Sequence, residues 1–286
     1  MKGTKRKKMQ IFLYILAVLL ITFIIWVARE NTAVELNTIN IKSPKLPSSF
    51  DGYKIAHISD LHNTQLGKTD GKLIRFLKEA KPDIIAITGD MLDTRRVGFE
   101  FDVEFVKQAV MIAPCFFVTG NHEAKSPHYA KFKKELIDAG VVIIDDNKID
   151  IERSGEKITL LGINDPLFKT KEFSGKSRTV TEKRLKSLSI DDSMYNVLLS
   201  HRPEMFDLYV KYNLDVVLCG HAHGGQFRLP FIGGLFAPNQ GAFPKYDSGL
   251  YTENGTNMIV SRGIGKSIIP FRINNPPEII IVEFNK

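Results

Sequence analysis

Cysteine is scarce in this sequence, with only Cys115 and Cys219 among 286 residues. Each lies inside or at the end of an apolar run, so we expect two small buried side chains, although the sequence leaves a disulfide open. Two isolated thiols do not supply the thiolate cluster of a structural zinc site. Internal repeats and low-complexity tracts are also absent, and no twin-arginine pair precedes the apolar stretch near the N-terminus.

Net positive charge is scarce outside the first eight residues. The chain carries a net charge of +7, but five of these charges lie within residues 1–8 and only +2 remains for the rest. A domain that binds nucleic acid by neutralising phosphates usually carries its basic residues on the folded part. The charge distribution therefore argues against a nucleic-acid partner. The five basic residues are Lys2, Lys5, Arg6, Lys7 and Lys8.

Charged side chains are absent from Met9–Ala28. As a helix this stretch is roughly 30 Å long, the thickness of a bilayer's hydrocarbon core. The basic residues before it and Trp26 near its outer end predict a cytoplasmic N-terminus and an extracytoplasmic domain. A cleaved signal peptide is the alternative, but the apolar core is long and Trp26–Glu30 offers no good cleavage site. We expect an uncleaved, single-pass anchor in the cell membrane.

The chain divides into four expected parts. Residues 1–8 form a basic cytoplasmic N-terminus, residues 9–28 the transmembrane anchor, residues 29–50 a linker and residues 51–286 one folded domain. The linker is expected because Asn31–Ser49 contains Pro44, Pro47 and a Ser pair without helical periodicity.

Apolar periodicity predicts alternating strands and helices over residues 53–144. Such alternation indicates parallel strands with right-handed crossovers. The second half is richer in strands, and the total favours an α/β (α+β) fold, a four-layer αββα sandwich of two mixed sheets flanked by helices. The predicted strands are Tyr53–Ser59, Ile84–Thr88, Cys115–Thr119, Val141–Ile144, Ile149–Glu152, Lys157–Leu161, Asn196–Ser200, Asp215–Cys219, Asn257–Ser261 and Glu278–Phe284. The predicted helices are Leu73–Ala80, Phe99–Ala113, Pro127–Ala139, Thr181–Leu188 and Pro203–Tyr212.

Metal-binding side-chain types follow five of these strands. Any one of them alone is better explained as a turn, a cap or a core histidine, but five strand ends carrying histidine, aspartate or asparagine indicate one site at the carboxyl edge of the sheets. Imidazole and carboxylate without thiolate suit Zn, Fe or Mn. Glycines at 89, 120 and 220 fit tight turns that let ligands approach one another. The motifs are Asp60-Leu61-His62, Gly89-Asp90, Gly120-Asn121-His122-Glu123, His201-Arg202 and Gly220-His221-Ala222-His223. His57 and His128 fall outside them, and we expect them in a strand and at the surface.

In this order the motifs D-x-H, GD-x-x-D, GNHE, H and GHxH resemble those of the calcineurin-like metallophosphoesterases, over Phe50–Lys286. Leu46–Tyr53, Gly220–Gln226 and Ser261–Gly265 are similar to a membrane-anchored bacterial branch that includes phosphodiesterases and pyrophosphatases acting on lipids such as UDP-2,3-diacylglucosamine. The resemblance implies two mixed sheets and two divalent metal ions, with Mn favoured. It implies a first metal on Asp60, His62, Asp90 and His223, a second on Asp90, Asn121, His201 and His221, and a supporting role for Asp93.

The implied chemistry is attack on phosphorus by a metal-activated water, with Asp90 bridging the two metals. His122 would protonate the leaving alkoxide or stabilise its charge. Glu123 would either orient His122 or serve only as a carboxylate at a helix N-terminus. Arg202 and Arg262 are candidates for phosphate contact, with surface solvation as the alternative.

The sequence therefore predicts a dinuclear metal-dependent phosphoesterase that acts on a diester or pyrophosphate bond of a lipid-linked or envelope phosphate ester. A non-catalytic metal-dependent envelope-binding protein and a nuclease on the same fold are the alternatives. His122 argues against the first alternative, and the charge distribution and the anchor argue against the second. Residues 168–177 and 229–251 are expected to choose the substrate. Within the second loop, Phe231, Leu235, Phe236 and Phe243 either form a lipid-facing lip or pack on the core, and we expect packing.

Overall fold

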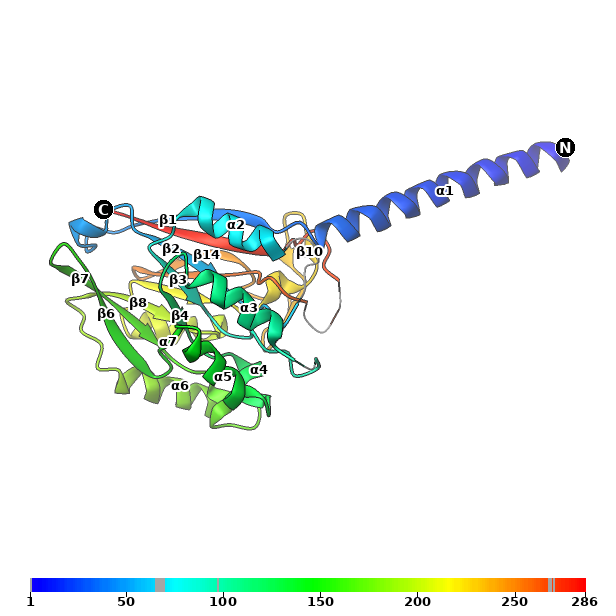
Figure 1. The fold of residues 1–286 in the computed structure, drawn as a ribbon. Helices are drawn as coiled ribbons and strands as arrows, with labels where there is room; N and C mark the ends of the chain where they lie inside the picture. Colours follow the sequence, from blue (N-terminus) through cyan, green and yellow to red (C-terminus); the bar gives the residue numbers. More distant parts are fainter. Residues whose placement is uncertain (1, 65–69, 97, 267–268, 270) are drawn as a thin grey trace.

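The computed structural model describes residues 2–64, 70–96, 98–266, 269 and 271–286, and it contains two six-stranded sheets (Figure 1). The first sheet has the order β1-β16-β2-β3-β4-β5 and the second has the order β14-β15-β9-β8-β7-β6. The first consists of β1 (Glu35–Lys42), β2 (Lys54–Ile58), β3 (Ile84–Ile87), β4 (Cys115–Phe117), β5 (Val142–Ile143) and β16 (Glu278–Asn285). The second consists of β6 (Asn147–Arg153), β7 (Glu156–Gly162), β8 (Tyr195–Leu199), β9 (Val216–Cys219), β14 (Gly249–Glu253) and β15 (Thr256–Val260).

Helices cover the outer face of each sheet and complete the predicted four layers. The first sheet shares a core with α2 (Asp70–Ala80), α3 (Glu100–Ala109) and α5 (Tyr129–Asp138), and the second with α6 (Gly175–Ser187) and α7 (Phe206–Lys211). A third cluster, which includes Ile55 and Val197, fills the space between the sheets. Because strands such as β3 and β8 are buried on both faces, they read as unbroken apolar runs. Cys115 and Cys219 are both buried and free, as the two apolar runs predict.

A long helix, α1 (Lys2–Glu30), projects from the domain (Figure 1). Its stretch Lys5–Glu30 is long and apolar enough to cross a membrane, and no part of its most apolar window is buried by the domain. The predicted apolar helix is therefore present, and it leaves its apolar side chains exposed.

Strand directions place the carboxyl edge of the first sheet on the side of α1. Strand β1 begins five residues after α1 ends, so its first residue lies near that helix. Strand β16 runs parallel to β1, and β2 runs antiparallel to β16. Strands β3 and β4 continue parallel to β2. The carboxyl ends of β2, β3 and β4 therefore point back toward the end of α1.

The expected linker is partly wrong, because it contains β1. Glu35–Lys42 pairs in parallel with Glu278–Asn285 along all eight residues. The strand lies at the edge of the sheet and buries only Ile41 completely, so its own sequence carries a weak apolar pattern. Its stability comes from a partner at the other end of the chain, and the ordered domain consequently begins close to α1.

Two short hairpins, which sequence periodicity missed, lie in the loop 229–251. They are β10 (Arg228–Leu229) with β11 (Gly233–Gly234), and β12 (Phe236–Ala237) with β13 (Gly241–Ala242). The expectation that Phe231, Leu235, Phe236 and Phe243 pack on the core is wrong for the three phenylalanines, whereas Leu235 is half-buried. Phe231, Phe236 and Phe243 are 109%, 59% and 67% exposed. Two-residue strands with three glycines provide too little apolar surface beneath them to bury such rings.

Candidate metal centre

The side chains predicted to bind metal meet where five strands end. Asp60 and His62 follow β2, and Asp90 follows β3. Asn121 opens the short helix α4 (Asn121–Lys125) after β4, while His201 follows β8 and the pair His221 and His223 follows β9. Both sheets therefore contribute side chains to the site, and motifs that are far apart along the chain lie close together in space.

Backbone strain is concentrated at this site. Asp60, His62, Asp90, His221 and His223 all have positive φ, between 48° and 66°. This left-handed region disfavours side chains other than glycine, and each such residue costs on the order of 1 kcal/mol. Strain that recurs at five residues in three neighbouring turns is retained because the turns aim their side chains at one point.

Two glycines allow the turns to approach one another. A Cβ atom at Gly220 would overlap the side chains of Ser59 and Asp60, and one at Gly120 would overlap the Asp90 carboxylate. These contacts explain why the motifs begin with glycine, as predicted for both positions. A side chain at either position would push the second sheet or α4 away from the aspartates.

The side chains form two groups on either side of Asp90. In the first group, His223 Nε2 lies 3.3 Å from Asp60 Oδ1 and 3.2 Å from His62 Nε2. In the second, His201 Nε2 lies 3.1 Å from Asp90 Oδ2, and His221 completes the group. The same Asp90 Oδ2 atom lies 3.9 Å from His62 Nε2. One carboxylate oxygen thus faces both groups, as a bridging ligand requires.

Backbone carbonyls fix the tautomers of two of these imidazoles. His201 Nδ1 lies 2.7 Å from the carbonyl oxygen of Thr88, and His62 Nδ1 lies 3.1 Å from that of Leu92. Because a carbonyl oxygen only accepts, Nδ1 of each neutral ring carries the proton, and Nε2 keeps its lone pair toward the site. Metal-binding histidines commonly use their second nitrogen in this way.

Burial also keeps most of these imidazoles in the neutral form that binds metal. It lowers the pKa of His62 to about 3 and the pKa of His221 and His223 well below the usual value. His201 differs, because the Asp90 carboxylate outweighs burial and raises its pKa to about 10. Burial raises the pKa of Asp60 to about 6. The neighbouring imidazoles, His201 above all, outweigh burial and hold the pKa of Asp90 well below its usual value, so both carboxylates are ionised at neutral pH.

Buried polar atoms without a protein partner support a fit to metal ions. Asp60 Oδ1, Asn121 Oδ1 and His201 Nε2 are buried and make no hydrogen bond to the residues that the structure describes. Such atoms are costly unless something else satisfies them, and each lies where the site converges. Oxygen and imidazole donors of this kind suit divalent ions such as Mn, Fe or Zn. The residues present therefore fit the pair of metals that the sequence implies.

His122 is held beside these groups through one ring nitrogen. The backbone N–H of Thr94 donates to His122 Nδ1 over 3.0 Å, so the neutral ring carries its proton on Nε2. Asp93 Oδ1 lies 3.6 Å from the same Nδ1. Asp93 and Thr94 thus perform the orienting role, and the supporting position expected for Asp93 agrees with this placement.

Glu123 does not orient His122. Its two carboxylate oxygens accept hydrogen bonds from the backbone N–H groups of Asp90, Leu92 and Gly120, over 2.8–2.9 Å. Burial, with the nearby Asp90 carboxylate, raises the pKa of Glu123 to about 8. The alternative role at a helix N-terminus therefore describes it better: Glu123 ties the start of α4 to the turn that carries Asp90.

Replacing Glu123 by alanine should destabilise the protein more than it changes catalysis by His122. Three buried N–H groups would lose their acceptor, which we expect to lower Tm by roughly 10 °C. Thermal unfolding of the detergent-solubilised chain measures this, with Glu123→Gln as the control that keeps one acceptor oxygen. An unchanged Tm combined with a large loss of activity would instead support the orienting role.

The two predicted arginines have different surroundings. The Arg202 guanidinium is buried and contacts Asp165 over 2.5 and 3.2 Å, so surface solvation is the wrong explanation for it. It also lies 2.9 Å from His221 Nε2, beside the second group. Arg262 is not brought to the metal centre, because it pairs with Glu278 over 2.7 Å and with Glu35 over 2.8 Å. Glu35 lies in β1 and Glu278 in β16, and the sequence alone does not predict that these strands lie beside Arg262.

A hollow opens over the metal centre, and both predicted substrate loops contribute to it. Asp90, Asn121, His122, Arg202, His221 and His223 form its floor. Phe173 from the first loop and Asn239 from the second line its sides, together with Lys125. Sequence reasoning missed Asn239, whose Oδ1 accepts from Arg202 over 2.6 Å, because it lies in a turn with no periodic signal.

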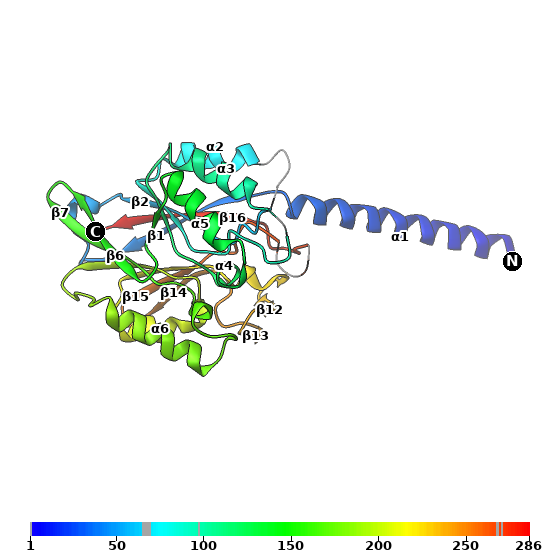
Figure 2. The same cartoon turned by 60° about the horizontal axis from the view of Figure 1, so that its bottom comes forward.

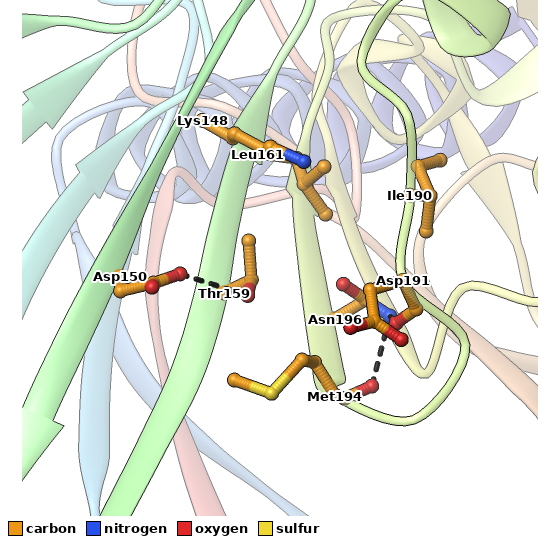
Figure 3. A pocket seen from close by; sticks show the side chains of 8 residues that line it. All are labelled: Lys148, Asp150, Thr159, Leu161, Ile190, Asp191, Met194 and Asn196. Carbon is orange, nitrogen blue, oxygen red and sulfur yellow. Dashed lines mark hydrogen bonds between the residues drawn. The ribbon is translucent and has the colours of Figure 1, made fainter.

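A second hollow, drawn in Figure 3, lies at the opposite edge of the second sheet, where β8 begins. Its polar side chains bond to one another and to the backbone: Thr159 donates to Asp150 over 3.1 Å, and Asn196 donates to the carbonyl of Met194 over 2.8 Å. Among the described residues, the groups of side chains suited to a metal all lie at the other edge. We therefore place the functional site at the carboxyl edge.

Comparison with known proteins agrees with this geometry. The model of the calcineurin-like phosphoesterase family matches residues 53–225, more than half of the chain. An uncharacterized metallophosphoesterase of Bacillus subtilis, YkuE, is 28% identical over 259 residues, covering 88% of this chain and 86% of that protein. The phosphodiesterase YaeI of Escherichia coli is 25% identical over 238 residues, covering 81% and 82%.

A solved structure supports the fold. The crystal structure of TT1561 from Thermus thermophilus superposes with a TM-score of 0.51 at 14% identity, covering 74% of this chain and 90% of that one. The matched region of the family model includes the motifs after β2, β3, β4, β8 and β9, which are the motifs that meet at the metal centre. The chain therefore belongs to the calcineurin-like phosphoesterases and is a hydrolase of phosphoric ester bonds.

Proposed function

We propose that the protein is a dinuclear metal-dependent phosphodiesterase or pyrophosphatase that acts on a lipid-linked or envelope phosphate ester outside the cytoplasm. The observation that carries the dinuclear centre is the position of Asp90 Oδ2 between two groups of buried ligands. Asp60, His62 and His223 would hold one ion, and Asn121, His201 and His221 the other, with Asp90 shared. When bound, the metals supply an activated water and neutralise phosphoryl oxygens.

The remaining residues of the hollow would bind substrate and move a proton. His122 directs its Nε2–H toward the leaving oxygen, where it would stabilise the developing charge or donate the proton, because Thr94 occupies its other nitrogen. Arg202 and Lys125 line the same hollow and can contact the phosphate. The pairing of Arg202 with Asp165 holds the guanidinium in place, so it would orient the phosphate without a large entropic cost.

The location of the protein rests on α1. The basic residues 1–8 would stay in the cytoplasm, and the helix would anchor the domain on the outer side of the membrane. The carboxyl edge of the first sheet faces the side where α1 ends, which supports a substrate that belongs to the membrane or the adjacent envelope. Of the divalent ions that suit these ligands, we favour Mn.

Metal removal tests the proposed chemistry. We expect the full chain in detergent micelles to hydrolyse bis-p-nitrophenyl phosphate, to lose at least about 10²-fold in rate after chelation, and to recover with added Mn²⁺. Asp90→Ala is the matched control and should not recover. Metal binding without turnover of any diester or pyrophosphate would favour the non-catalytic envelope-binding alternative. A rate for single-stranded DNA comparable to that for small diesters would favour a nuclease.

A further inference from the structure

Large apolar side chains are exposed on the two hairpins beside the metal centre. Phe231 and Ile232 form the turn between β10 and β11 and are 109% and 60% exposed. Phe236 and Phe243 lie on either side of the turn between β12 and β13. Scattered exposed residues are ordinary, but four large ones on two hairpins that follow each other directly in the chain indicate an interaction site. We call these four residues the hairpin surface.

A chain of contacts connects these hairpins to the end of α1. Asn31, just after the helix, exchanges two hydrogen bonds with the backbone of Arg272, over 2.7 and 2.9 Å. The neighbouring Ile273 carbonyl accepts from the N–H of Arg228 over 3.0 Å, at the start of β10. The rings of Phe227 and Phe271 lie 5.5 Å apart. The hairpins are thus held close to the point where the helix leaves the domain.

Apolar surface continues from α1 onto this side of the domain. Phe23, Ile24 and Val27 of the helix line a shallow hollow together with Phe271 and Lys266 of the domain. Phe271 itself is 42% exposed. Figure 1 shows β10 beside the base of α1, and Figure 2 shows β12 and β13 on the same end of the domain. The C-terminus lies at the other end.

We propose that the hairpin surface inserts into the interfacial layer of the bilayer that α1 crosses. The occupant is the lipid bilayer itself, because the apolar helix α1 lines a hollow together with Phe271, whose ring lies beside Phe227 at the base of the hairpins. Phenylalanine and isoleucine side chains suit the boundary between headgroups and acyl chains. Lys245, exposed two residues after Phe243, and Lys266 at the rim of the hollow suit anionic headgroups.

The insertion would open the catalytic hollow at the membrane surface. Pro238 and Asn239 form the turn of the β12–β13 hairpin and also line the hollow over the metal centre. With Phe236 and Phe243 in the bilayer, that turn lies at headgroup level, where the phosphate of a lipid is found. A lipid phosphate ester could then reach the metal centre without leaving the membrane. This consequence rests on the proposed function, whereas the insertion itself does not.

Fluorescence quenching by brominated lipids tests the insertion in the full chain. Trp26 in α1 is the only tryptophan, so the wild-type protein reports on the anchor alone. The double variant Trp26→Phe, Phe231→Trp reports on the hairpin surface, and Trp26→Phe, Phe243→Trp repeats the test at a second position. The matched control is Trp26→Phe, Met111→Trp. Met111 is 84% exposed but precedes β4, at the edge of the sheet opposite the metal centre.

We expect vesicles of phosphatidylglycerol and brominated phosphatidylcholine to quench tryptophan at 231 and 243 at least about twofold more than tryptophan at 111. Equal quenching at 231, 243 and 111 would overturn the insertion. Emission at 231 that shifts with protein density but not with bromination would overturn it in favour of a second copy of the chain. Quenching of Trp26 in the wild type separately tests the anchor, and hydrolysis of bis-p-nitrophenyl phosphate by each variant separately tests the enzyme.

Discussion

Replacing Asp90 by asparagine should remove both metal ions together and lower kcat for bis-p-nitrophenyl phosphate by at least about 10³-fold. Asp90 Oδ1 accepts from the backbone N–H of His122 over 2.8 Å, and the asparagine carbonyl can keep this bond. The amide nitrogen then occupies the place of Oδ2, which faces His62 and His201. A donor replaces a shared acceptor, although the shape of the side chain is nearly unchanged.

Elemental analysis together with kinetics measures this outcome. His223→Ala and Asn121→Ala are the matched controls, because each removes a ligand from one group only. We expect each of them to weaken mainly one metal and to retain the other. Loss of a single metal in Asp90→Asn, with the second bound at wild-type affinity, would place the bridge on another side chain.

Local sequence patterns predict the core of the metal centre because its geometry follows from strand ends. An apolar run ending in Gly89-Asp90 or Gly220-His221 identifies both the strand and the side chain at its carboxyl edge. Parallel pairing brings such ends together within each sheet, and the packing of one sheet on the other brings the two edges together. The same reasoning predicts the hairpin between β6 and β7, where Ser154 and Gly155 both have positive φ.

What the sequence misses depends on partners distant in the chain. The edge strand β1 exists because Glu278–Asn285 pairs with it. Glu123 could not be assigned, since the backbone donors that it satisfies lie in a different turn. Arg262 forms ion pairs with Glu35 and Glu278, which lie in β1 and β16. By contrast, Asn254-Gly255 is a local signal for the β14–β15 hairpin that periodicity alone overlooks.

Exposure of the hairpin surface was the least predictable feature. Phe231 and Phe243 are as apolar as Phe117, which is completely buried. Composition cannot separate these cases, because burial depends on whether other elements cover the ring. Here the hairpins lie at the end of the domain from which α1 projects (Figure 2). The phenylalanine rings can therefore be covered only by something that lies on that side.

Replacing His122 by alanine should reduce turnover in proportion to the leaving group's need for a proton. For alkyl leaving groups we expect kcat to fall by about 10²–10⁴-fold, because the Nε2 proton that Thr94 and Asp93 position is lost. For p-nitrophenyl leaving groups the loss should be much smaller, since p-nitrophenolate departs without protonation. A series of methyl phosphate diesters with graded leaving-group pKa measures the change in slope.

Metal content distinguishes this role of His122 from that of a ligand. Its Nδ1 is occupied by Thr94, and the two groups around Asp90 are complete without it, so His122→Ala should retain both ions. Asp93→Asn is the matched control for positioning: it keeps the His122 ring but changes the side chain that lies beside its Nδ1, so we expect a smaller loss with the same dependence on leaving group. An equal loss across the whole series, or the departure of a metal ion from His122→Ala, would show that His122 acts as a ligand and not as the general acid.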